Sequence, residues 1–183
     1  QLDPGDFCAG DFINAMVIRE PLQRLESQVN YRVDEDYLSG PCRYDHLIAR
    51  LQADSVTQDL QRECQLQLPS FDNYVVRLLG GKSVMNLPAG SVGTEHFEKA
   101  MSVLKLFDLV VPMEMMSGGH ALLDLNRVLG WNLQSQDVRP HYSWTGALER
   151  PTSGHSARFS DEQFQYLRHL NRFDLALYEL VAE

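Results

Sequence analysis

The stretch FINAMVIREPLQRLESQ, Phe12 to Gln28, predicts a strand, a turn and a helix in direct succession. Residues 12–18 are nearly all apolar, which is typical of a strand that is covered on both faces. The apolar run ends at Arg19, and Pro21 stands where the first turn of a helix tolerates proline. Apolar residues then recur at helical spacing, at Leu22, Leu25 and Val29. This order of elements indicates an α/β fold.

Composition limits the number of domains and the classes of function. The chain has 183 residues, 44% of them apolar, which suits one domain with a core and is too short for two. No apolar run of about 18 residues or more occurs, and the first residues show no signal-peptide pattern. The formal charge of -9 argues against a nucleic-acid binder, because neutralising phosphates requires an excess of Lys and Arg.

Neither a metal site nor a phosphate-binding P-loop is predicted. The histidines lack metal-ligand spacing, and Cys8, Cys42 and Cys64 form no C-x-x-C motif. Their number fits either one disulfide with a spare thiol or three buried thiols. GGKS, residues 80–83, has the end of a P-loop motif, but Val76 stands where that motif needs its first glycine.

Helical periodicity continues along the chain. The helices that it predicts are marked by apolar residues at 47–51, 56–64, 74–79, 97–104, 122–129 and 164–178. Gly80-Gly81 is expected to end the third of these, and Thr94 to cap the fourth. Ser160 and Gln163 form a capping box for the last one, which we expect to be one long closing helix.

Strands are fewer than a parallel sheet requires. FDLVVP, residues 107–112, is the only other buried strand that the pattern predicts. Because a two-stranded parallel sheet leaves strands without neighbours, either strands escaped detection or the chain shown belongs to a larger domain. The expectation is a parallel sheet with flanking helices and a helix-rich C-terminal half.

Arg19 is the first candidate for a binding function. It falls at the carboxyl end of the first strand, where open α/β sheets bind their ligands. A guanidinium there can hold a phosphate through paired hydrogen bonds, and Ser27 can add a hydroxyl. Arg24 lies three residues before Ser27 and so shares one flank of the helix with it. The alternative is a local ion pair of Arg19 with Glu20 or Asp11, with Ser27 merely exposed.

The segment VIREPLQRLESQ resembles the R-D-P-x-x-R-x-x-S segment of the carbohydrate sulfotransferases, especially the Golgi heparan sulfate 2-O and 6-O type. Glu20 stands where that family usually has Asp. The resemblance implies that Arg19 and Ser27 bind the 3'-phosphate of the sulfate donor, 3'-phosphoadenosine 5'-phosphosulfate. It also implies that Pro21 sets the turn and that Arg24 supports it, and Arg24 is a further candidate donor-binding residue.

Three later segments resemble the same family in the right order. FDNYVVRLLGG, residues 71–81, is similar to its N-Y-x-x-R-x-L-x-G helix, and residues 98–114 are similar to a helix that leads into a strand. LNRFDLALYELVA, residues 170–182, is similar to its terminal helix. Arg77 is a candidate donor-binding residue in the first of these, although Asn73 and Arg77 can equally pair with each other or with neighbouring loops.

The remaining polar and aromatic residues have structural interpretations beside functional ones. Asn171, Asp174 and Tyr178 share a helical stripe, which favours hydrogen-bonded packing. Trp131 and Trp144 are expected to anchor the core or a loop rather than stack on an adenine.

A loop at residues 131–159 contains the last candidates. Its basic residues, Arg139, Arg150 and Arg158, outnumber its acids from residue 138 onward, which indicates a surface for an anionic donor or acceptor. Arg158 is the donor-binding candidate among them. The alternative is a mobile loop whose charges are only solvated.

The resemblance implies one sulfotransferase-like domain over residues 1–183, with a P-loop-like sheet. Its activity would transfer a sulfuryl group from the nucleotide donor to a hydroxyl of a glycan, in the Golgi lumen. In that family the phosphosulfate loop and the catalytic base lie upstream of the segment that corresponds to residues 12–18. Members of the family are anchored in the membrane by an N-terminal helix. The domain is therefore expected to be incomplete at its N-terminus, and its catalytic residue stays unknown.

Two other functions remain open at this point. The chain could be a non-catalytic, sulfotransferase-derived structural or interaction subunit that works through protein partners. The charge of -9 favours this alternative, because enzymes that act on polyanionic glycans usually present basic clefts. A generic nucleotide-binding module would explain Arg19 and Ser27 but none of the later segments.

Overall fold

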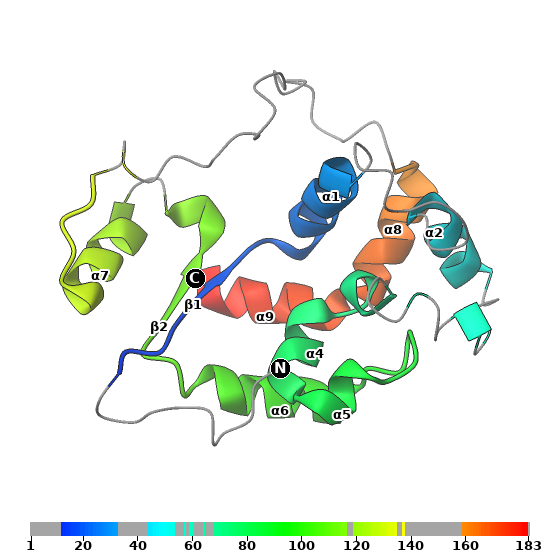
Figure 1. The fold of residues 1–183 in the computed structure, drawn as a ribbon, viewed down its shortest axis with the longest axis horizontal. Helices are drawn as coiled ribbons and strands as arrows, with labels where there is room; N and C mark the ends of the chain where they lie inside the picture. The colour runs from blue at the N-terminus through cyan, green and yellow to red at the C-terminus, as the bar shows by residue number, and fades with distance from the viewer. Residues whose placement is uncertain are drawn as a thin grey trace.

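The computed structural model describes residues 12–32, 44–53, 57, 59–60, 64, 68–116, 119–134, 137 and 159–182. This part of the chain is mostly helical and contains a two-stranded parallel sheet (Figure 1). In chain order its elements are β1 (Ala15–Ile18), α1 (Pro21–Arg32), α2 (Tyr44–Gln52), the 3₁₀ helix η3 (Leu68–Phe71), α4 (Tyr74–Gly80), α5 (Lys82–Met85), α6 (Thr94–Leu104), β2 (Leu109–Pro112), the 3₁₀ helix η4 (Met113–Met115), α7 (Gly119–Leu129), α8 (Asp161–Leu170) and α9 (Arg172–Ala182).

The sheet joins the two strands that the sequence predicts. β1 pairs in parallel with β2, in a register that runs from Ala15 opposite Leu109 to Ile18 opposite Pro112. Both strands are shorter than their apolar runs. Just before the first paired residues, a side chain forms a hydrogen bond between the two segments. The Asp108 carboxylate accepts a hydrogen bond from the backbone N–H of Asn14 at 2.8 Å. The α/β character is confirmed at this coarse level.

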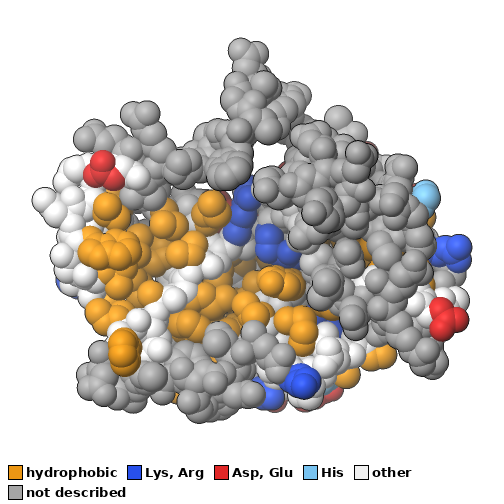
Figure 2. Space-filling model, in the orientation of Figure 1, with side chains coloured by type: hydrophobic (Ala, Val, Ile, Leu, Met, Phe, Trp, Pro, Cys, Tyr) orange, Lys and Arg blue, Asp and Glu red, His pale blue; other side chains and the backbone are white. Residues whose placement is uncertain are grey.

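One face of the sheet is exposed, so the prediction that the first strand is covered on both faces is wrong for the described chain. Ile18 is buried, whereas Val17 is 50% exposed. Phe12 and Ile13, which precede the strand, are also exposed. Figure 2 shows apolar side chains gathered over the region of β1, β2 and α7. The reason is that β1 turns alternate residues to opposite faces, and only one face meets the buried core.

The buried apolar residues form two clusters. The first lies between α1, α2 and α8 and consists of Leu22, Leu25, Leu47, Ile48, Leu51, Cys64, Phe71, Leu167 and Leu170. The second lies between the sheet, α4, α6 and α9 and consists of Ile18, Val75, Val76, Leu79, Val92, Ala100, Val103, Leu104 and Leu177. Figure 1 shows α9 running between the two groups of helices. Cys64 is disulfide-bonded, which favours the disulfide over three free thiols.

Most helix boundaries follow the predicted signals. Gly81 (φ 82°) and Gly130 (φ 66°) end α4 and α7 in the left-handed region that favours glycine. Thr94 was expected to cap α6, but it is the first helical residue. Gly93 occupies the cap, and its N–H donates to His96 Nδ1 at 2.9 Å. The short helix α5, which begins at the exposed Lys82, was not predicted.

The closing helix is two helices, not one. The capping box at its start is confirmed, because Gln163 N donates to Ser160 Oγ at 3.2 Å and Ser160 N to Gln163 Oε1 at 2.9 Å. The break falls at Asn171, where the backbone leaves the helical conformation. The Asn171 amide donates to Phe71 O at 2.6 Å and accepts from Asn73 N at 3.0 Å. These long-range bonds explain why helical periodicity alone failed to show the break.

Several predictions fall on residues outside the described part. The helix at 56–64 and the loop at 131–159 are described at scattered positions only, and Arg158 and Trp144 are among the residues not described. Trp131 is described and is 55% exposed, so it is not a core residue. Within the described ranges, no helix has the length and apolar character that crossing a membrane requires. The same ranges contain no cluster of three or more potential metal-binding side chains.

Candidate anion-binding site

Arg19 lies directly after β1, at the carboxyl end of the sheet. Its side chain is 27% exposed, and its Nε lies 3.9 Å from Glu114 Oε1. This ionic contact is with Glu114, not with Glu20 as the sequence suggested, and Asp11 lies outside the described residues. Within the described chain the guanidinium makes no hydrogen bond, because 3.9 Å is too long for one. Arg19 can therefore offer its N–H groups to an anion.

Ser27 lies on α1, about 9 Å along the helix axis from Pro21 if each residue rises 1.5 Å. Its side chain is partly buried, and its hydroxyl makes no hydrogen bond to any residue that the structure describes. Figure 2 shows basic side chains where β1 leads into α1, beside the apolar surface over the sheet. Arg19 and Ser27 thus keep polar groups available on the same strand-turn-helix unit.

Arg24 has a structural role in the same unit. Its Nη2 donates to Ser70 O at 2.6 Å, and its Nη1 donates to Gln28 Oε1 at 3.0 Å. The guanidinium also lies over the Tyr74 ring, 4.8 Å from its centroid. These contacts tie α1 to the segment that leads into α4.

Glu20, the acid of this turn, has a structural role at the start of α1. Its Oε2 accepts a hydrogen bond from Gln23 N at 2.6 Å, so the carboxylate caps the first turn of α1. Pro21 is the first helical residue, where its lack of an N–H has no cost. Because Glu20 already occupies this helix end, an anion at the site depends on side chains such as Arg19.

Glu114 connects the two strand ends to α9. Its Oε1 accepts from the backbone N–H of Glu20 at 3.2 Å, and its Oε2 accepts from the Tyr178 hydroxyl at 2.8 Å. Burial raises the pKa of Tyr178 to about 12, together with the hydrogen bond to Glu114 and the negative charges of Glu114 and Glu20. The hydroxyl therefore remains a donor at neutral pH. The sequence interpretation did not connect Glu114 with Arg19, although both follow strands whose carboxyl ends share one edge.

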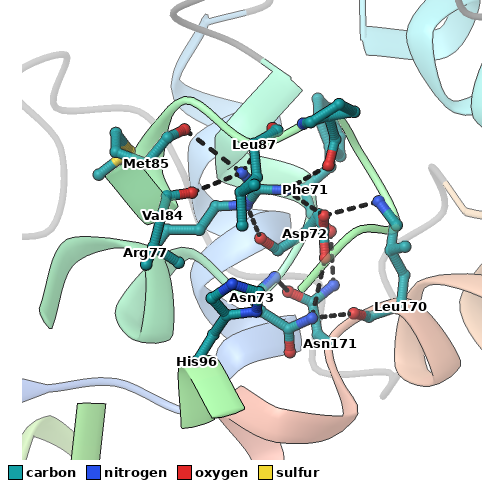
Figure 3. Close-up of polar contacts among 12 residues, drawn as sticks. Phe71, Asp72, Asn73, Arg77, Val84, Met85, Leu87, His96, Leu170 and Asn171 are labelled. Atoms are coloured by element: carbon teal, nitrogen blue, oxygen red, sulfur yellow. Dashed lines mark hydrogen bonds and ion pairs between the residues drawn. The ribbon is translucent and has the colours of Figure 1, made fainter. Parts of the chain in front are cut away.

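Arg77 lies inside the protein and has no exposed surface. Its Nε donates to Asp72 O at 2.7 Å, and its Nη2 donates to the Asp72 carboxylate and to Pro88 O at 3.0 Å. Its Nη1 donates to Leu87 O at 2.8 Å and to Val84 O at 3.1 Å. Figure 3 shows the guanidinium directed at acceptors that come from Asp72, before α4, and from α5 and the residues just after it. Since every N–H of the guanidinium has an acceptor, Arg77 stabilises the packing of these segments against α4. We do not keep it among the donor-binding residues.

Asn73 and Asp174 cap each other's helices. Asn73 Oδ1 accepts from Phe173 N at 3.0 Å and from Asp174 N at 3.1 Å, in the first turn of α9. The Asp174 carboxylate accepts from Val75 N at 2.9 Å and Val76 N at 2.8 Å, in the first turn of α4. Burial raises the pKa of Asp174 to about 6, and the two N–H groups oppose this rise. The expected packing role of the Asn171–Tyr178 stripe is confirmed for Asp174.

Comparison of the chain with protein-family models, with curated proteins and with solved structures gave no match. The sulfotransferase resemblance therefore stays a prediction, and the site is judged on its own contacts. An arginine with available N–H groups and a serine hydroxyl on the helix that follows it can each donate a hydrogen bond to a phosphate or sulfate group. These two side chains do not by themselves supply a base or a nucleophile.

Proposed function

We propose that the chain is a sulfotransferase-like domain that binds the 3'-phosphate of 3'-phosphoadenosine 5'-phosphosulfate through Arg19 and Ser27. The observation that carries the proposal is that Arg19 is partly exposed and has N–H groups available. Its guanidinium stands at the carboxyl end of a parallel strand, is partly exposed and makes no hydrogen bond within the described chain. The proposal includes a P-loop-like sheet of which β1 and β2 are two strands. Arg24 supports the site and does not contact the donor.

The activity that we propose is transfer of a sulfuryl group to a hydroxyl of a glycan. In this transfer a bond forms between the acceptor oxygen and sulfur, the bond from sulfur to the donor's 5'-phosphate oxygen breaks, and the acceptor proton passes to a base. Arg19 and Ser27 would hold the nucleotide end that does not react, so their contribution is positioning. No described residue is assigned as the base.

The disulfide of Cys64 supports a location in the secretory pathway. Disulfides persist in oxidising compartments and are rare in the cytosol. A Golgi-luminal enzyme, held by a membrane anchor outside the described residues, is consistent with a buried disulfide-bonded cysteine in the first core cluster. This location is part of the proposal.

A second candidate function is that of a non-catalytic interaction subunit. Phe12 is 69% exposed, Leu123 63% and Trp131 55%. Large exposed apolar side chains that lie together mark contact surfaces, and aromatic residues are enriched at protein interfaces. Figure 2 shows hydrophobic side chains gathered on one face of the molecule. In this function the protein partners would be bound there, and Arg19 would be an inherited anion site without turnover.

The test is a calorimetric titration of the chain with adenosine 3',5'-bisphosphate, the nucleotide product of sulfuryl transfer. We expect Arg19→Ala to weaken binding about tenfold to a hundredfold, because it removes charge-assisted hydrogen bonds. Ser27→Ala should weaken it less, since a neutral hydroxyl makes a weaker bond. Arg127→Ala is the matched control, because Arg127 is an exposed arginine on α7 that pairs with Asp124. Equal affinities of Arg19→Ala and Arg127→Ala would refute the proposal.

A further inference from the structure

The Glu114 carboxylate holds together three elements at the carboxyl end of the sheet. Glu114 follows β2, and its Oε1 accepts from the N–H of Glu20, just after β1. Its Oε2 accepts from Tyr178, on α9. Each carboxylate oxygen therefore has its own hydrogen-bond donor, and neither donor is the Arg19 guanidinium. The Arg19 Nε is nevertheless only 3.9 Å from Oε1, within the range of an ionic attraction.

We propose that Glu114 is a positioning residue of the anion site, which orients Arg19 by fixing the Arg19–Glu20 peptide. The proposal rests on the proposed function, because it takes Arg19 as the residue that binds the phosphate. Glu114 itself does not contact the nucleotide. It acts through the backbone N–H of Glu20 and through its attraction for the guanidinium.

The hydrogen bond to Glu20 N fixes the backbone from which Arg19 extends. A peptide bond is planar, so holding its N–H also holds the carbonyl side that belongs to Arg19. The Glu114 contact with Nε is longer than a hydrogen bond, so it attracts the guanidinium while leaving its N–H groups available. An arginine that is held in place before binding loses fewer conformations when an anion arrives.

Tyr178 holds Glu114 in turn. Its hydroxyl donates to Oε2 at 2.8 Å from α9, a helix that packs in the second core cluster through Leu177. Rigid secondary structure therefore supports Glu114 through the carboxylate oxygen that Glu20 does not use. Without this donor the carboxylate would keep its bond to Glu20 N but could rotate more freely.

The negative charge of Glu114 would oppose an anion, and two substitutions separate charge from positioning. Glu114→Gln keeps an oxygen that can accept from Glu20 N and removes the charge. Glu114→Ala removes both. If positioning dominates, the Gln variant binds the anion at least as well as the natural chain and the Ala variant binds it less well.

The experiment titrates the chain and its variants with adenosine 3',5'-bisphosphate and with adenosine 5'-monophosphate, which lacks the 3'-phosphate. We expect Glu114→Ala to weaken binding of the bisphosphate about fivefold or more, and Tyr178→Phe to weaken it less. Glu114→Gln should bind it at least as tightly as the natural chain. Binding of the monophosphate should be unchanged in all three variants. Glu179→Gln, which removes an exposed acid of α9 beside Tyr178, is the control and should change neither affinity.

A second measurement follows the Glu20 amide by NMR without ligand. Its hydrogen bond predicts a downfield amide proton that is retained in Glu114→Gln and moves upfield in Glu114→Ala. The positioning role is overturned if Glu114→Ala leaves both this amide and bisphosphate affinity unchanged, or if the Gln and Ala variants lose affinity equally. If Arg19→Ala binds the bisphosphate as well as the natural chain does, the proposed function fails even where the Glu20 amide behaves as predicted.

Discussion

Asp174 should make the protein more stable relative to an Asp174→Asn variant as the pH falls. Its carboxylate is 1% exposed and accepts hydrogen bonds from Val75 N and Val76 N. Burial raises its pKa from 3.8 to about 6. Because the folded state then binds the proton more tightly than the unfolded state, protonation between these pKa values favours folding. This contribution is present at low pH and is lost as the pH rises through 6.

The magnitude follows from the two pKa values. Lowering the pH from about 7.5 to about 4.5 should add about 2 kcal/mol to the free energy of unfolding through Asp174 alone. The Asn variant has no proton to gain at this position, and its other carboxylates are the same. The difference in unfolding free energy between the natural chain and the Asn variant should therefore shift by about 2 kcal/mol in favour of the natural chain between these two pH values.

The assay is urea unfolding of both proteins at several pH values between these limits, followed by circular dichroism. The difference in unfolding free energy between the two proteins isolates Asp174. A difference that stays constant over this range, or that shrinks on acidification, would contradict a raised pKa of Asp174 in the folded protein. If Asp174→Asn does not fold, NMR titration of the Asp174 carboxyl in the natural chain gives the same test, since its midpoint should lie near pH 6.

Two further predictions concern the residues around the site. Arg77→Met should lower the free energy of unfolding by about 3–5 kcal/mol in urea, because it leaves the buried Asp72 carboxylate without its cation, and Arg77→Lys should restore only part of it. A loss below about 1 kcal/mol would contradict the burial of this pair. Glu20→Ala should cost about 1 kcal/mol by removing the cap of α1, whereas Glu20→Asp, the acid that the sulfotransferase motif usually has, should keep most of it. Equal stabilities of these two variants would count against the cap.

Local signals in the sequence predicted the local structure well. The Ser160–Gln163 capping box, the glycine stops at Gly81 and Gly130 and the proline at the start of α1 all depend on neighbouring residues. Their physical causes, a cap or a backbone conformation, act within a few residues. They could therefore be recognised without knowing the fold.

Features that depend on distant residues were missed. The break at Asn171 results from hydrogen bonds to Phe71 and Asn73, which lie about a hundred residues earlier in the chain. The burial of Arg77 depends on carbonyl groups of the segment after α5, which no side-chain pattern reveals. The exposed face of β1 was missed because an apolar run shows only that a strand can be buried.

The candidate site was predicted in part. The position of Arg19 after the first strand could be predicted, because the apolar run and Pro21 define the strand end and the helix start. Its contact with Glu114 could not, because it joins two strands through the register of the sheet. From the sequence alone, Arg77 and Arg19 were both candidates for donor binding, and only the fold separates a buried structural arginine from a partly exposed one.

The most direct test of the proposed 3'-phosphate site combines Arg19→Ala with removal of the 3'-phosphate from the ligand. Affinities of the natural chain and of Arg19→Ala are measured for adenosine 3',5'-bisphosphate and for adenosine 5'-monophosphate. If Arg19 binds the 3'-phosphate, the substitution weakens only bisphosphate binding, with a coupling free energy of about 1.5–3 kcal/mol. If Arg19→Ala changes both affinities equally, or neither, Arg19 does not bind the 3'-phosphate and the account is contradicted.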